Sequence, residues 1–109
     1  MISLNVNDLD WSKQNGLLPV VVQDNSSKEI LMVAYANKDA LEKTCNTNLA
    51  HFWSRSKQKL WLKGETSGNT QKIINVLVDC DEDTLLYLVE STGPACHTGT
   101  RSCFFRSVD

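Results

Sequence analysis

At 109 residues the chain is expected to fold as one domain, residues 1–109, with room for a modest core. A formal net charge of −2 excludes the strongly basic surface that nucleic-acid and anionic-membrane binders use. The start of the chain does not resemble a secretory signal, and no apolar run approaches the ~18 residues that cross a bilayer. We therefore expect a cytoplasmic protein, and its small size favours an oligomer in which a second subunit completes a site.

The first half of the chain is predicted to hold a short helix, a β-hairpin and a longer helix. Segment 8–16 has early acidic residues, a tryptophan and a final glycine, which is typical of a short helix. Apolar runs at 18–24 and 30–36 flank a polar turn cluster, which predicts a hairpin. Asn37 can cap a helix over 38–46.

The second half is predicted to be mostly strands joined by irregular loops. The predicted strands are 51–56, 59–63, 72–80 and 84–90. The loop "GETSGNT" separates the second strand from the third, and "STGPACHTGTRSC" follows the fourth. The fold class is therefore mostly β (α+β): a small mixed or antiparallel sheet with one or two short helices.

The stretch "DCDED" sets four acids and one thiol side by side between two apolar runs. In an extended segment successive side chains point to opposite faces, so Asp79, Asp81 and Asp83 would share one side and Cys80 the other. Mg²⁺ prefers carboxylate oxygens, whereas a thiolate prefers a softer metal. The alternation predicts two metal sites back to back; the alternative is a solvated acidic turn.

Four cysteines in a reducing cytosol favour metal ligation or catalysis over disulfides. Cys96 and Cys103 lie seven apart in a glycine-containing loop that can fold two thiolates onto one ion. Cys80 would be a third ligand, which leaves catalytic zinc an open position. His97 is better suited to act as a general acid/base than as a ligand, or it is an ordinary loop histidine. Cys45 is expected to be a core thiol.

Four motifs, in this order, resemble the phosphoribosyl-AMP cyclohydrolase family: "HFWSRS", "LWLKGETSGNTQ", "DCDED" and "GPACHTGTRSCF". The likeness runs from about Leu18 to Arg106. It implies an enzyme of histidine biosynthesis, a cyclic amidine hydrolase acting on 1-(5-phosphoribosyl)-AMP. Such an enzyme opens the adenine ring at the N1–C6 bond and gives the formimino-aminoimidazole carboxamide ribotide.

The resemblance also implies metal ligands and an intertwined homodimer. Magnesium would be held by Asp79, Asp81 and Asp83. Zinc would be held by Cys80, Cys96 and Cys103, with Cys80 supplied by the partner subunit. Leu62 departs from the pattern, because many members carry a histidine there, and any catalytic role of that histidine is unassigned in this chain.

For this reaction we expect zinc-bound hydroxide to add to C6 while His97 moves a proton, with Glu65 as the second candidate catalytic residue. The candidate substrate-binding residues are Arg55, Lys63, Thr66, Ser67, Arg101 and Trp53. The cations would hold the two phosphates, and the tryptophan would stack on the adenine. Taken alone, "KGETSGN" favours an ordinary hairpin loop over a phosphate-binding loop, and a tryptophan on a strand is more often part of the core.

Two other functions stay open. One is a small binding module in which zinc is structural and the acids are solvated. The other is a zinc-dependent hydrolase of a different modified purine nucleotide. The chain has no paired C-x₂-C knuckles and no cluster of basic residues, which counts against a nucleic-acid-binding zinc module.

Overall fold

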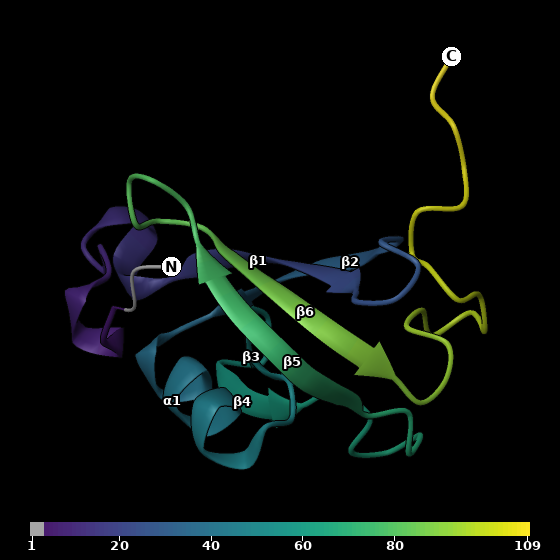
Figure 1. The fold of residues 1–109 in the computed structure, drawn as a ribbon, viewed down its shortest axis with the longest axis horizontal. Coiled ribbons are helices and arrows are strands. Elements are labelled where there is room, and N and C mark those ends of the chain that lie inside the picture. Colours follow the sequence, from purple (N-terminus) through teal and green to yellow (C-terminus); the bar gives the residue numbers. More distant parts are fainter. Residues whose placement is uncertain (1–3) are drawn as a thin grey trace.

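A four-stranded mixed sheet dominates the computed structural model, which describes residues 4–109 (Figure 1). The strand order is β2-β1-β6-β5, and a separate hairpin is formed by β3 and β4. The strands are β1 (Leu18–Asp24), β2 (Ile30–Ala36), β3 (His51–Ser54), β4 (Lys59–Leu62), β5 (Gln71–Val78) and β6 (Leu85–Ser91). The predicted fold class, mostly strands around a mixed sheet, is confirmed.

A parallel pairing joins the two halves of the chain. β1 pairs with β6 in parallel, from Val20 opposite Leu85 to Asp24 opposite Val89. The two sequence-adjacent pairs, β1–β2 and β5–β6, are antiparallel hairpins. Local sequence predicts such hairpins, but the parallel contact joins segments more than sixty residues apart, so alternation within each strand gives no sign of it.

The N-terminal segment differs from the single short helix predicted for 8–16. It forms two 3₁₀ turns, η1 (Val6–Asp8) and η2 (Lys13–Gly16). Gln14 and Asn15 have φ of 51° and 58°, so the backbone enters the left-handed region before a helix can continue. The prediction of one helix here was therefore wrong.

The only α-helix among residues 4–109 is α1 (Lys38–Thr47), as predicted. The Asn37 side chain accepts a hydrogen bond from the backbone N–H of Ala40 at 2.9 Å and so caps the first turn. The helix ends at Asn48, whose left-handed backbone (φ 60°) stops the turn. No helix in the described part of the chain is long and apolar enough to cross a membrane.

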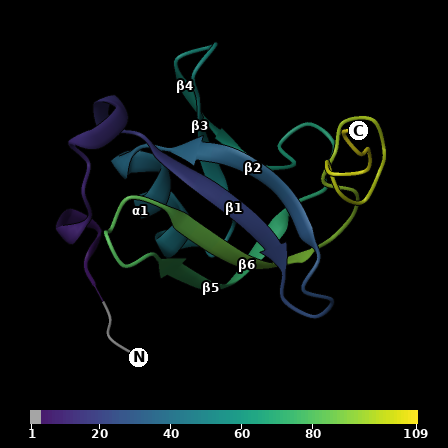
Figure 2. The same cartoon turned by 90° about the horizontal axis from the view of Figure 1, so that it is seen from above.

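The core lies between one face of the sheet and the layer formed by α1 and the β3–β4 hairpin (Figure 2). Strand β1 shows why: Leu18, Val20 and Val22 are buried, and the residues between them are only half-buried. Tyr87 of β6 is fully buried, and its ring stacks on Phe52 with centroids 5.7 Å apart. The alternation of β1 and β6 thus directs every second side chain into a single core.

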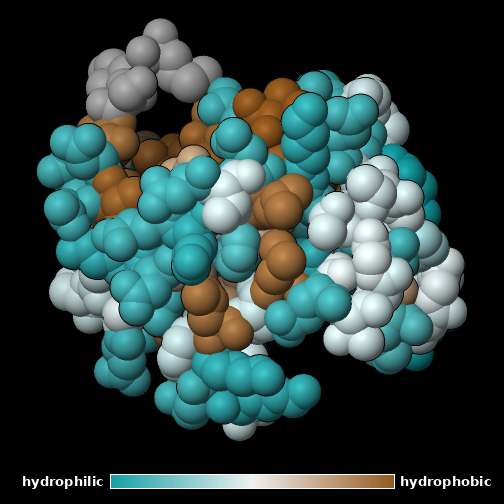
Figure 3. Space-filling model, turned by 90° about the horizontal axis from the view of Figure 1, so that it is seen from below, coloured by the Kyte–Doolittle hydropathy of each residue, from teal (hydrophilic) through white to brown (hydrophobic). Residues whose placement is uncertain are grey.

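In the layer formed by α1 and the β3–β4 hairpin, the side of α1 that faces away from the sheet is polar. The exposed residues of α1 include Lys38, Asp39, Glu42 and Lys43. Seen from below, the molecule is mostly hydrophilic, with hydrophobic side chains in a broken strip (Figure 3).

The N-cap gives a stability prediction. Replacing Asn37 by Ala removes the side-chain acceptor for the Ala40 N–H, so the free energy of unfolding should fall by about 1 kcal/mol, measured by urea titration. Asn37→Asp is the matched control, because a carboxylate accepts the same bond and should keep most of the stability. Equal losses in the two variants would contradict the capping role.

Candidate active site

A cavity of about 370 Å³ lies between the loop that follows β4 and the loop that follows β6. Its wall gathers several of the candidate residues from two segments some thirty positions apart. These are Lys63, Glu65, Thr66, Ser67, Cys96 and His97. The structure therefore brings the two candidate catalytic residues and three of the six candidate substrate-binding residues to one place; their roles stay predictions.

The loop after β4 is closed on itself and on the β6 side by close backbone packing. Gly64 has φ of 86°, and a Cβ there would collide with the backbone of Asn69. A Cβ on Gly93 would collide with the Asn69 side chain. Thr92 N–H also donates to the Thr70 carbonyl at 3.1 Å. The cavity wall is therefore held in place by close backbone packing, which is possible because Gly64 and Gly93 have no side chain.

Lys63 connects the two walls of the cavity. Its ammonium donates to the carbonyl oxygen of Ala95 at 2.6 Å, in a half-buried position next to Cys96. An ammonium has three donors, so this bond leaves capacity for an anion in the cavity. Lys63 both lines the site and fixes the spacing of its two loops.

Two thiols meet in the loop after β6. The side chains of Cys96 and Cys103 lie close enough to shift each other's pKa: Cys103 helps to lower the pKa of Cys96, and Cys96 helps to raise the pKa of Cys103. The hydroxyl of Thr98 donates to Cys96 Sγ at 3.0 Å and is the main reason that the pKa of Cys96 is lowered to about 6. Burial raises the pKa of Cys103. At neutral pH Cys96 is thus mostly thiolate, the form that binds metals.

Cys80 does not join this pair. It lies in the turn between β5 and β6, beside the acidic residues. Cys103, by contrast, donates its backbone N–H to the Leu31 carbonyl at 2.7 Å, at the start of β2. The strand pairings place these two points at opposite ends of the sheet. One copy of the chain therefore presents two thiols at one end and one at the other.

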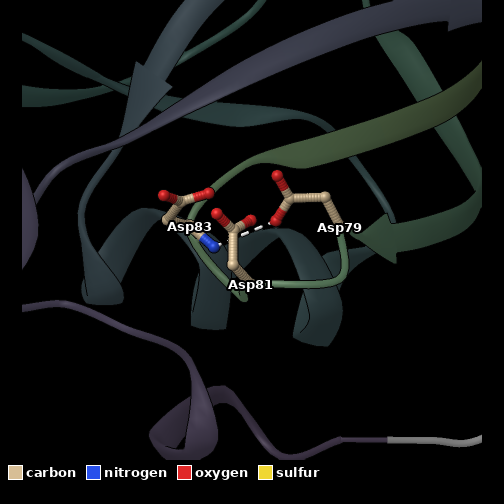
Figure 4. A group of neighbouring side chains, drawn as sticks. All are labelled: Asp79, Asp81 and Asp83. Carbon is tan, nitrogen blue, oxygen red and sulfur yellow. Dashed lines mark hydrogen bonds between the residues drawn. The ribbon is translucent and has the colours of Figure 1, made fainter.

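The acidic residues converge, but not as an extended strand. β5 ends at Val78, and the next residues form a turn in which the Asp79 carboxylate accepts the N–H groups of Asp83 (3.0 Å) and Thr84 (3.1 Å). Ligand atoms of Asp79, Asp81 and Asp83 lie within 4.8 Å of one another (Figure 4). The strand alternation assumed for "DCDED" was wrong, and an Asp-capped turn produces the convergence instead.

A lysine distant in sequence partly neutralises this acidic cluster. Lys13 Nζ lies 2.9 Å from Asp83 Oδ2 and 3.7 Å from Asp10 Oδ2. The Lys13 ammonium lowers the pKa of Asp83, whereas side-chain hydrogen bonds with Asp83 and Asp79 raise the pKa of Asp81. Lys13 lies seventy positions before Asp83, so no local sequence signal indicated this contact.

Arg101 lies outside the cavity wall and is held by two carboxylates. Its guanidinium lies 3.0 Å from Asp24 Oδ1 and 2.8 Å from Glu29 Oε1, at the turn between β1 and β2. The Ser102 hydroxyl donates to the Ile30 carbonyl at 2.6 Å in the same region. These contacts attach the loop that carries Cys96 and Cys103 (the cysteine loop) to the β1–β2 hairpin. Arg101 therefore stabilises the position of this loop.

The remaining candidates for substrate binding are also outside the cavity wall. The Arg55 guanidinium lies over the Tyr35 ring, 3.8 Å from its centroid. Trp53 is half-buried on β3, whereas Trp61 of β4 lines the cavity and packs on Phe52. The motifs "HFWSRS" and "LWLKGETSGNTQ" contribute one tryptophan each, and only Trp61, in the second, lines the cavity.

The prediction that Cys45 is a core thiol was wrong. Cys45 is exposed as a residue, and the buried side of α1 is formed by Ala40, Leu41 and Thr44. Its thiol lines a separate groove near the N-terminal segment, and partial burial raises its pKa. The buried stripe of α1 runs through Ala40, Leu41 and Thr44, and Cys45 lies one residue, about 100°, further round the helix from Thr44, at the edge of that stripe.

These observations define a small α+β domain with a preformed polar cavity and two separate donor sets, one of sulfur and one of oxygen. A family model described as phosphoribosyl-AMP cyclohydrolase matches residues 32–105. Relatives named phosphoribosyl-AMP cyclohydrolase include one from Cenarchaeum symbiosum, 55% identical over 103 residues (94% of this chain, 95% of the relative). Another, from Methanosarcina mazei, is 60% identical over 96 residues (88% and 80%).

A bacterial relative of the same name, from Clostridium botulinum, is 54% identical over 101 residues, 93% of this chain and 92% of the relative. The chain belongs to the phosphoribosyl-AMP cyclohydrolase family. The resemblance carried by the four sequence motifs is confirmed, and it extends over nearly the whole chain.

The ion pair between Arg101 and Asp24, which holds the cysteine loop, predicts a stability that depends on pH. The Ser27 N–H and the Arg101 guanidinium hold the pKa of buried Asp24 below its ordinary value of 3.8. Asp24→Asn keeps an acceptor for the turn but loses the charge, so the free energy of unfolding near pH 7 should fall by about 1–2 kcal/mol. Because the folded pKa is depressed, the wild-type advantage should persist above pH 4 and vanish as the pH falls further.

Urea titrations of wild type and Asp24→Asn from pH 7 down to pH 3 measure this difference. Glu29→Gln is the matched control: this carboxylate is exposed and binds the same arginine, so its loss should cost less than about 0.5 kcal/mol. A stability gap that does not change with pH would contradict the charge-based brace.

Proposed function

We propose that this protein hydrolyses the N1–C6 bond of the adenine ring in 1-(5-phosphoribosyl)-AMP, a step of histidine biosynthesis. The observation that carries the proposal is the cavity that gathers Lys63, Glu65, Thr66, Ser67, Cys96 and His97 from two separate loops. These residues belong to the two longest motifs of the family resemblance. Membership of the family, over nearly the full length of the chain, supports the same reaction.

The donor sets fit the metals that the family implies. Three carboxylates with ligand atoms within 4.8 Å suit a hard cation such as Mg²⁺, held by Asp79, Asp81 and Asp83. The adjacent Cys96 and Cys103, one of them readily ionised, suit zinc. Cys80 lies at the other end of the sheet, so a third thiolate would come from a second copy in a homodimer.

Zinc, when bound, would lower the pKa of a water molecule from about 15.7 to about 7 and so supply hydroxide at neutral pH. The chain's own residues account for the rest of the reaction. Oxygen is added at C6, the C6–N1 bond breaks, and N1 takes up a proton. His97 lies in the cavity wall and is suited to deliver that proton, since an imidazole ring can both donate and accept a proton.

Substrate binding would fall to the loop after β4. Lys63 retains donors beyond its bond to Ala95, and the exposed Thr66 and Ser67 hydroxyls can donate to a phosphate. Glu65, in the same loop, could accept from a ribose hydroxyl or from water. Trp61 offers an aromatic surface for the adenine. The second phosphate would need a further cation, such as Mg²⁺ at the acidic turn of a second copy, because this chain's own acidic turn lies at the other end of the sheet.

The direct test is turnover. Purified protein with zinc and magnesium should open the purine of phosphoribosyl-AMP, followed by the change in ultraviolet absorbance. His97→Asn should lower kcat by about 100-fold or more, with a smaller change in KM, because it removes a proton donor. The other histidine, His51, lies outside the cavity with Nδ1 2.8 Å from the Leu49 carbonyl, so His51→Asn is the control and should retain activity. Absence of turnover by the wild type would remove the proposal.

The shared thiolate site can be tested by mixing two inactive chains. Cys80→Ser and Cys96→Ser should each lose zinc and activity when alone. In a mixed dimer one of the two sites keeps all three thiols, so an equimolar mixture after exchange should regain about a quarter of the wild-type activity. Recovery of nothing, with mixed dimers verified by mass spectrometry, would place each site within one chain.

A further inference from the structure

The Asn69 side chain belongs to the cavity wall but has no role in the proposed function as stated above. It lies in the loop after β4, is half-buried, and lines the cavity together with Trp61 and His97. Its backbone N–H donates to the Ser67 hydroxyl at 3.2 Å, whereas its side-chain amide forms no hydrogen bond within residues 4–109. Polar groups that are shielded from bulk water normally have a partner. The Asn69 amide is therefore free to bind a ligand in the cavity.

The amide is held in place although it forms no hydrogen bond of its own. A Cβ on Gly93 would collide with Oδ1 and Cγ of Asn69, so the bare Gly93 backbone lies directly against one side of the amide. The next residue in the chain is also fixed, because the Thr70 carbonyl accepts from the Thr92 N–H at 3.1 Å and from the Thr92 hydroxyl at 3.0 Å. A polar group that is fixed before binding loses little conformational freedom when a ligand arrives.

The other polar groups of this loop offer simpler hydrogen-bonding patterns. The Lys63 ammonium only donates, and the Glu65 carboxylate only accepts. The hydroxyls of Thr66 and Ser67 each carry a single polar atom. The Asn69 amide presents a donor and an acceptor side by side in one plane, which is the pattern that binds the N6–H and N7 edge of adenine with two hydrogen bonds.

That edge stays open in the substrate class of the proposed function. In 1-(5-phosphoribosyl)-AMP the second ribose phosphate is attached to N1 and blocks the edge through which adenine normally pairs. N7 and the exocyclic N6–H on the opposite edge stay free. Trp61 of the same wall would contact the face of the ring, whereas hydrogen bonds to the edge lie in the plane of the ring, so the two contacts do not compete.

We propose that Asn69 recognises the adenine of the substrate, with Nδ2 donating to N7 and Oδ1 accepting from the exocyclic N6–H. The inference rests on the proposed function, because it takes a 1-substituted adenine nucleotide to occupy this cavity. Both adenine atoms persist through the reaction: N7 remains a ring nitrogen of the imidazole, and N6 becomes the carboxamide nitrogen. Because the contact exists before and after the C6–N1 bond breaks, it contributes to binding and not to the chemical step.

The test compares AMP with 7-deaza-AMP, which has a C–H group in place of N7 and is otherwise identical. The wild type, loaded with zinc and magnesium, should bind AMP about 10-fold more tightly, because 7-deaza-AMP cannot accept the hydrogen bond from Nδ2. Asn69→Ala should weaken AMP binding by about 10-fold and bind the two nucleotides within about 2-fold of each other. Isothermal titration calorimetry measures each Kd, and far-ultraviolet circular dichroism checks that each variant is folded.

Asn69→Asp gives a second and sharper comparison. Aspartate has nearly the same size and keeps the contact with Gly93, but its carboxylate only accepts and would face the lone pair of N7. The preference should therefore invert, with 7-deaza-AMP bound more tightly than AMP. Thr66→Ala, in the same loop, is the matched control: it should weaken both nucleotides equally and leave the ratio of the two Kd values unchanged.

Kinetics provide an independent readout. With phosphoribosyl-AMP as substrate, Asn69→Ala should raise KM by about 10-fold and leave kcat within about 2-fold of the wild type, as expected for a contact that is equal in the ground state and the transition state. A fall in kcat with KM unchanged would overturn the binding role.

The outcomes separate this inference from the proposed function. The ratio of the two Kd values needs no turnover, so a preference for AMP that disappears in Asn69→Ala supports the contact even if the wild type does not hydrolyse phosphoribosyl-AMP. A wild type that turns over substrate while Asn69→Ala keeps the preference for AMP overturns the contact and leaves the function standing. A wild type that binds the two nucleotides equally, or binds neither, also overturns the contact.

Discussion

The parallel pairing of β1 with β6 is the constraint on which the rest of the structure depends. It places the end of β6, from which the cysteine loop starts, beside the turn between β1 and β2. Arg101 can then bind Asp24 and Glu29, and Cys103 can bind Leu31. The same pairing carries the acidic turn to the opposite end of the sheet. One non-local contact thus sets the separation between the oxygen donors and the sulfur pair.

Two of the three candidate phosphate-binding cations are engaged by other groups of the chain, whose net charge is −2. Arg101 is taken up by Asp24 and Glu29, and Arg55 by the Tyr35 ring. Lys63 is the cationic side chain in the described cavity wall, and it is already bonded once. The described cavity wall therefore offers little positive charge of its own to an anionic ligand.

Local sequence predicted the strands and α1 well because each needs only its own alternation or cap, as β1 and Asn37 illustrate. It predicted the grouping of Lys63 to Ser67 with His97 only through the family resemblance, since nothing in either loop points to the other. The bracing role of Arg101 and the contact of Lys13 with Asp83 were missed because both depend on tertiary proximity. For the acidic stretch, the sequence correctly predicted that the three aspartates converge, but for the wrong reason. They lie in a turn that is capped by the Asp79 carboxylate, and not in an extended strand with alternating side chains.

A chain of 109 residues has little core with which to enclose a site on every side. The chain instead builds its cavity from two loops at one end of the sheet and sets its carboxylate cluster in a turn at the other end, where neither needs space in the core.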